Sequence, residues 1–152
     1  MLVARGRLED RQAVVNIGVQ PFVPRAVDIA PHQAAVVAPI DSYRALLDTG
    51  AQRTCLTFKA INEQRLVRHG KRFIKNVHSE ALHSTFIVNL GIWCDGVTEH
   101  LDPVHSYYAL PEPVEVINIA DNNRFDAILG MDVLIRFDVI FERSGHFEVR
   151  LN

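Results

Sequence analysis

The chain has 152 residues, of which 48% are hydrophobic and 22% charged, and its 16 basic and 18 acidic residues give a formal net charge of −2. This length suits one domain with a hydrophobic core, so we expect a single domain over residues 1–152. The near-neutral charge argues against nucleic-acid binding, and no apolar run approaches the roughly 18 residues typical of a membrane span.

The chain start and the cysteines indicate a cellular compartment. Residues 1–10 carry four charged side chains and no apolar signal core, so secretion is not expected. The two cysteines, Cys55 and Cys94, form no CxxC pair and cannot build a disulfide framework. We therefore expect a reduced, cytoplasmic protein in which Cys55 is a small buried side chain.

Most of the sequence is typical of β-strands. Apolar and β-branched segments predict strands, in chain order, over residues 13–19, 34–40, 43–47, 73–77, 85–90, 92–94, 114–119, 137–141 and 147–151. Turns are expected at Asp41-Ser42, at Asp95-Gly96 and over residues 143–146, with a hairpin tip over residues 78–81. The Pro-flanked stretch 103–113 is interpreted as a surface loop.

Only two short helices are predicted. Thr57 is placed to cap the first, which is expected to continue through Leu66 and to end before Gly70. Asp132 is placed to cap the second, which is expected to run to Ile135. So many short strands with so little helix favour an all-β barrel or sandwich.

An acid, a hydroxyl and a glycine follow an apolar strand in Ala45-Leu46-Leu47-Asp48-Thr49-Gly50-Ala51. A strand holds its terminal carboxylate rigidly at the edge of a core, and Gly50 permits a sharp backbone turn there. The hydroxyl of Thr49 can bond to neighbouring backbone and fix the loop. A turn that only closes a strand has the same composition, so the tripeptide alone leaves both interpretations open.

A second segment, residues 125–134, is an apolar strand that ends at Gly130 and leads into a short helix. Together the two segments resemble the retropepsin-like aspartic proteases. The signature of this family is an apolar-apolar-Asp-Thr/Ser-Gly-Ala loop and, after a flap hairpin, an apolar-apolar-Gly segment followed by a short helix. Thr54 and Leu56 also match the family pattern, and residues 128–134 look like the ILGxDxL form of bacterial members. The resemblance covers residues 13–151.

The resemblance implies a closed β-barrel with a flap hairpin and one or two short helices. It also implies an endopeptidase that hydrolyses peptides or proteins without a cofactor or metal. Such enzymes use two carboxylates that share one proton: one activates a water, and its protonated partner polarises the scissile carbonyl. Because this chain has a single Asp-Thr-Gly, the resemblance implies a homodimer with Asp48 of each copy at the two-fold axis.

The same resemblance assigns roles to further residues. Thr49 would hold the two loops together across the axis, and Gly50 would leave room for the substrate main chain. The implied substrate-binding residues are Ala51, Gln52, Ser79, Glu80 and Ala81, and the implied structural residues are Ile128, Leu129, Gly130 and Asp132. Viral members often carry an acid at the position of Gln52 and glycines at the flap tip, so their substrate preference does not transfer to this chain.

Other functions remain open or are disfavoured. The alternative is a catalytically weak or inactive dimerisation or peptide-binding module, which has no physical need for a paired buried acid. The terminal strands, which viral members interleave between subunits, could do so here. The seven histidines form no metal-ligand pattern, and the basic run over residues 65–75 is interpreted as a solvated face.

Overall fold

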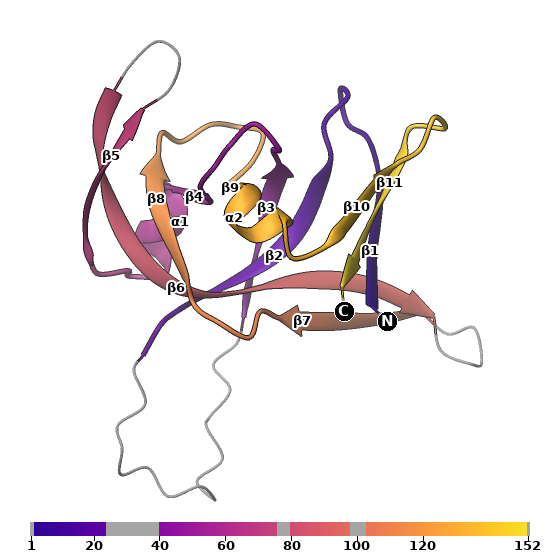
Figure 1. Cartoon of the computed structure of the whole chain (residues 1–152). Helices are drawn as coiled ribbons and strands as arrows, with labels where there is room; N and C mark the ends of the chain where they lie inside the picture. Colours follow the sequence, from indigo (N-terminus) through magenta and orange to yellow (C-terminus); the bar gives the residue numbers. More distant parts are fainter. Residues whose placement is uncertain (1, 24–39, 76–79, 98–102, 152) are drawn as a thin grey trace, which may run out of the picture.

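The structure, a computed structural model, describes residues 2–23, 40–75, 80–97 and 103–151, and most of them lie in β-strands. The strands are β1 (Leu2–Arg7), β2 (Val14–Pro21), β3 (Asp41–Leu47), β4 (Cys55–Thr57), β5 (Gly70–Lys75), β6 (Glu80–Val97), β7 (Pro103–Ala109), β8 (Val114–Ile119), β9 (Ala127–Leu129), β10 (Asp138–Phe141) and β11 (His146–Leu151). The helices are α1 (Phe58–Glu63) and α2 (Met131–Leu134) (Figure 1). The prediction of an all-β fold with two short helices is confirmed. Within the described residues, neither helix is long and apolar enough to cross a membrane.

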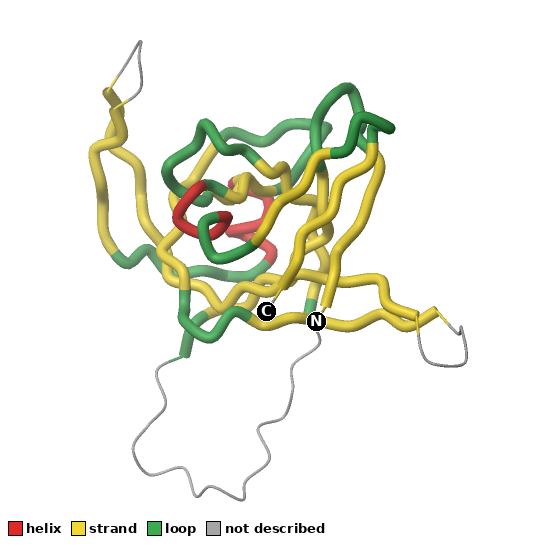
Figure 2. The backbone as a smooth tube through the Cα atoms, turned by 45° about the vertical axis from the view of Figure 1, so that its right-hand side comes forward, coloured by secondary structure: helices red, strands yellow, loops and turns green. Residues whose placement is uncertain are grey.

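Six strands close into a barrel. They follow the order β2-β3-β9-β4-β8-β6, and β6 pairs back with β2. The 18 residues of β6 make this closure possible, because successive parts of the strand pair with β5, β8, β2 and β7. Figures 1 and 2 show β6 running from the hairpin with β5 along the base of the barrel to β7. The predicted closed barrel is therefore confirmed.

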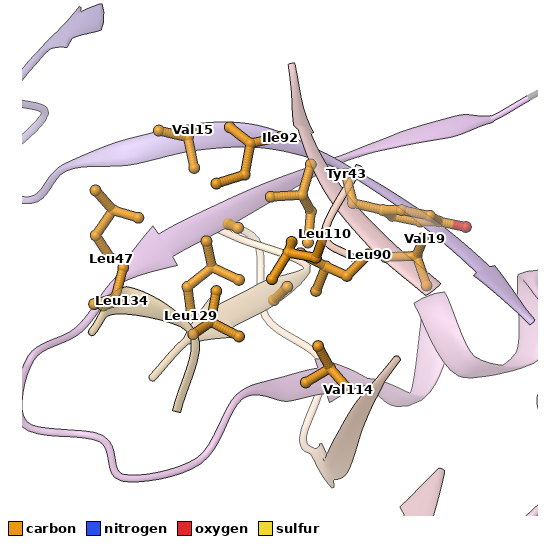
Figure 3. Packing of buried hydrophobic residues seen from close by; sticks show 14 of the residues in the cluster. Val15, Val19, Tyr43, Leu47, Leu90, Ile92, Leu110, Val114, Leu129 and Leu134 are labelled. Carbon is orange, nitrogen blue, oxygen red and sulfur yellow. The ribbon is translucent and has the colours of Figure 1, made fainter. Parts of the chain in front are cut away.

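The core lies inside this barrel. Val15, Ile17 and Val19 alternate along β2 and are buried, as are the alternating Leu90 and Ile92 of β6. This period of two directs one face of each strand inward. Figure 3 shows that side chains of β2 and β6 converge with those of β9 and α2. Burial of each such side chain contributes about 1.5–3 kcal/mol before entropy is counted.

A separate three-stranded sheet joins the chain ends, in the order β1-β11-β10. β1 pairs with β11 antiparallel, from Leu2 opposite Leu151 to Arg7 opposite His146. Both edges of β11 are thus occupied within the chain, and β1 and β10 are the edge strands of this sheet. β1 lies in a segment where the sequence predicts no strand, and interleaving of the terminal strands between subunits stays a prediction.

Two predicted turns are wrong because long-range pairing extends the strands through them. Asp41 and Ser42 lie inside β3, opposite residues of β2, whereas most of the preceding predicted strand lies outside the described residues. Asp95 and Gly96 lie inside β6, opposite residues of β7. The stretch predicted as a Pro-flanked loop therefore begins with β7, which continues the sheet.

The helix boundaries also differ from the prediction. Thr57 caps α1 as expected, and its Oγ1 accepts a hydrogen bond from the Ala60 N–H at 3.4 Å. The helix ends at Glu63 because Arg65 has a φ of 51°, which an α-helix cannot accommodate. Gly70 then opens β5 instead of marking the end of the helix.

Two glycines face each other where β2 meets β6, and an aromatic ring lies over both. Gly18 pairs with Gly91, and the Tyr107 hydroxyl donates to the Gly18 carbonyl at 3.4 Å. A Cβ on Gly91 would collide with the Tyr107 ring and would lie 2.5 Å from the Tyr108 carbonyl oxygen. Burial raises the pKa of Tyr107 to about 12. The barrel seam therefore depends on small residues under this ring.

We expect Gly91→Ala to lower the free energy of unfolding by about 1–3 kcal/mol, because the added methyl overfills the seam. Urea unfolding followed by the fluorescence of Trp93, the only tryptophan of the chain, measures this. Gly70→Ala is the matched control, since its Cβ would meet nothing closer than the Thr85 hydroxyl at 3.4 Å. Equal losses in the two variants would contradict the prediction.

Candidate active site

The loop that carries Asp48 begins where two parallel strands end. β3 pairs in parallel with β9, and the Asp48 N–H extends this ladder by donating to the Leu129 carbonyl at 3.1 Å. The carboxylate itself is half-buried, and its Oδ1 accepts the Gly50 N–H at 2.9 Å. A Cβ on Gly50 would lie 3.1 Å from this oxygen, so the close approach favours glycine. The turn therefore orients the Asp48 carboxylate at the end of a buried strand.

The second segment of the resemblance, residues 125–134, contains β9. This strand lies at the centre of the region because it runs between β3 and β4, the strands before and after the Asp48 loop. β9 is parallel to β3 and antiparallel to β4, with Ile128 opposite Cys55. Leu129 is fully buried, whereas Ile128 is half-buried. The resemblance predicts a structural role for these residues, and their position between β3 and β4 is consistent with one.

A hydrogen-bonded clamp joins the Asp48 loop to α2. Thr54 is completely buried, and its hydroxyl donates to Asp132 Oδ1 at 2.8 Å and accepts the Gly130 N–H at 3.2 Å. Asp132 Oδ2 accepts the Thr54 N–H at 3.1 Å. Two backbone bonds complete the junction, from the Met131 N–H to the Ala51 carbonyl at 2.8 Å and from the Asp132 N–H to the Gln52 carbonyl at 3.3 Å. We call these contacts the Thr54–Asp132 clamp.

Gly130 allows this junction to close. A Cβ at this position would lie 2.6 Å from the Arg53 carbonyl carbon and 2.7 Å from its oxygen. The expected capping role of Asp132 is wrong, because Gly130 is the N-cap of α2 and Asp132 lies in the first turn. Its carboxylate bonds to the buried donors of Thr54, which have no access to water.

A groove of about 870 Å³ lies beside the loop. It is lined by residues 50–53 and Cys55, by residues 72–75 of β5 and by Ile117 of β8. Gly50, Ala51 and Gln52 thus line the groove, and binding of a substrate by Ala51 and Gln52 stays a prediction. Glu80 and Ala81 pair with the end of β5 and do not line it, while Ser79 lies outside the described residues.

No protein-family model matches the sequence, and no curated protein matches it significantly. The structure is similar to that of a retropepsin-like aspartic protease from Rickettsia conorii, with a TM-score of 0.51 over 97% of this chain and 90% of that chain. The chain has the retropepsin-like fold. The two sequences are 12% identical, so the similarity extends to the fold alone.

Cys55, the first residue of β4, carries a poorly reactive thiol. Its side chain is buried, as predicted, and its Sγ lies 3.4 Å from the Arg53 carbonyl oxygen. Burial raises the pKa of the Cys55 thiol to about 12, and the Asp132 and Asp48 carboxylates act in the same direction. A thiol that stays protonated at neutral pH is a poor nucleophile. Among the described residues, no group of three or more His, Cys, Asp or Glu side chains is placed to hold a metal ion.

Sequence reasoning missed the cationic side chains of the groove. Arg72 and Lys75 belong to the run interpreted as a solvated face, yet they line the groove from β5. Arg53 lines it as well. The available signal was the position of this run directly before the predicted flap tip, which the resemblance places over a bound peptide.

We expect Asp132→Asn to lower the free energy of unfolding by about 2 kcal/mol, because an amide cannot accept both donors of buried Thr54. Urea unfolding measures this change. Asp138→Asn, at an exposed position at the start of β10, is the matched control and should change stability little. An unchanged Asp132→Asn protein would show that the clamp does not hold the loop.

Proposed function

We propose that the chain is a homodimeric aspartic endopeptidase in which the Asp48 carboxylates of two copies activate a water molecule. The observation that carries this proposal is the fixed position of the Asp48 carboxylate. It sits at the end of a buried strand, is oriented by the Gly50 N–H and is followed directly by loop residues that line a groove of about 870 Å³. The retropepsin-like fold supports the same function.

The proposed chemistry needs one proton shared between the two carboxylates. Like charges about 3 Å apart cannot both ionise, so one Asp48 is protonated while the other acts as general base. The base takes a proton from water as the water oxygen attacks the scissile carbonyl carbon, and the protonated Asp48 donates to the carbonyl oxygen. The tetrahedral intermediate then breaks its C–N bond as a carboxyl proton passes to the leaving nitrogen.

The proposed dimer contact lies on the Asp48 loop and α2. Thr49 and Gly50 are exposed, and α2 presents Met131 and, at its end, Ile135, which is 75% exposed. Exposed apolar side chains beside a functional loop suit an interface. Because both edges of β11 are occupied within the chain, we place the contact here and not on interleaved terminal strands.

The remaining predicted roles follow from this arrangement. Thr49 is positioned to bond to the partner loop across the two-fold axis. Ala51 and Gln52 line the groove, where the Gln52 amide can bond to the main chain of a peptide. The β5–β6 hairpin is proposed as the flap that covers the bound peptide and excludes water.

We expect Asp48→Asn to lower peptide cleavage at least about 100-fold, because the amide cannot act as a general base. Mass spectrometry of a diverse peptide mixture, incubated from about pH 4 to pH 7.5, measures new termini.

Asp138→Asn is the control and should cleave like the wild type. Cleavage that survives Asp48→Asn would contradict the proposed site. Peptide binding by the wild type without any new termini would instead indicate the binding module.

We expect Ile135→Glu to weaken self-association at least about tenfold, since a charge at an apolar interface must be desolvated. Sedimentation velocity over a range of concentrations measures the change, and cleavage should fall in parallel. Phe141→Glu on β10, where the side chain is 53% exposed, is the matched control. A dimer that survives Ile135→Glu and is lost in Phe141→Glu would move the interface to the β1-β11-β10 sheet.

A further inference from the structure

The groove carries a positive charge that the proposed peptide hydrolysis does not require. Arg53, Arg72 and Lys75 line it, and among the described residues no Asp or Glu is part of the lining. Gln52 adds a neutral amide beside them. A peptide in this groove therefore meets the side chains of Arg53 and Arg72, which their ion pairs with Glu115 hold close to each other.

One carboxylate behind the groove compensates part of this charge. Glu115 lies on β8, two residues before Ile117 and on the same face of the strand. Its Oε1 is 3.6 Å from Arg53 Nη1 and also accepts the Arg72 Nε–H. The same Glu115 oxygen thus links Arg53, which follows the Asp48 loop, to Arg72 of β5.

The two guanidiniums retain capacity for a ligand. Each has five N–H donors, and both share one carboxylate oxygen. The Arg53 and Arg72 side chains are 38% and 49% exposed, whereas Glu115 is 20% exposed. The cations therefore face the open side of the groove and the anion lies behind them.

Apolar side chains flank the cations. Ile74 lies two residues after Arg72 and on the same face of β5, and Ile117 lies on the same face of β8 as Glu115. Apolar side chains beside arginines suit a peptide that carries acidic residues next to an apolar stretch, because its apolar groups pack on the isoleucines and its carboxylates pair with the guanidinium groups.

We infer that the groove selects peptide segments in which acidic side chains lie on either side of a short apolar stretch, with their carboxylates bound by Arg53 and Arg72. This inference rests on the proposed function in one respect: a two-fold dimer repeats the groove, so the preference for an acid applies on both sides of the scissile bond.

The test uses full-length Asp48→Asn protein, which should bind peptide without cutting it. Fluorescence anisotropy compares fluorescein-labelled Ala-Glu-Ala-Leu-Phe-Ala-Glu-Ala with the same peptide carrying Gln in place of both Glu. We expect the acidic peptide to bind at least about fivefold tighter, with a preference that shrinks as salt is added. Equal affinities, or no binding of either peptide, would overturn the inference.

Variants made in this background separate recognition from a structural role. Arg72→Gln should reduce the preference for the acidic peptide to less than about twofold. Glu115→Gln should increase it, because both guanidiniums lose their competing carboxylate. Arg143→Gln, in the exposed turn between β10 and β11, is the matched control and should change nothing. Equal weakening of both peptides by Arg72→Gln and Glu115→Gln would show a structural network and overturn the inference.

Cleavage of the same two peptides by the wild type distinguishes this inference from the proposed function. Selective binding by Asp48→Asn protein without cleavage by the wild type supports the groove preference and contradicts the endopeptidase. Cleavage of both peptides at equal rates supports the endopeptidase and overturns the preference.

Discussion

The candidate site depends on one buried interaction, the Thr54–Asp132 clamp. Thr54 is fully buried, so its N–H and hydroxyl must find partners within the protein, and Asp132 and Gly130 supply them. The clamp joins the loop after β3 to the helix after β9. Because the Asp48 N–H also bonds to Leu129 on β9, both ends of the loop are tied to the same segment. The position of the carboxylate is thus set by contacts several residues away from it.

The barrel also fixes the position of the β5–β6 hairpin, the proposed flap. β6 forms the hairpin with β5, whose residues 72–75 line the groove, and then closes the barrel against β8 and β2. One continuous strand therefore supports both β5 and the core. The packing of Tyr107 over the paired glycines keeps β6 close to β2 at the seam. A shift of the core at this seam would therefore move the strand that supports the flap. The β5 side of the groove is thus anchored to the barrel through its pairing with β6.

The sequence predicts what depends on local chemistry and misses what depends on register. The Asp48 loop and the strand before Gly130 are recognisable because short segments carry their residue types in a fixed order. Asp95-Gly96 has the composition of a turn, yet pairing with β7 keeps it extended. Asp132 has the residue type and position of a helix cap, but in the structure its carboxylate accepts hydrogen bonds from the buried N–H and hydroxyl of Thr54. Such competition is decided by three-dimensional neighbours, which the sequence does not display.

The single chain already holds half of the proposed dyad in a defined geometry. Asp48 is oriented by backbone groups of its own chain, and the clamp is satisfied without a partner. Association of two copies would then bring together preformed loops, which limits the entropy lost on ordering them. The exposed Thr49 and Ile135 lie on the outward side of this rigid unit. Positioning of the carboxylate within the chain is therefore independent of the proposed contact between chains.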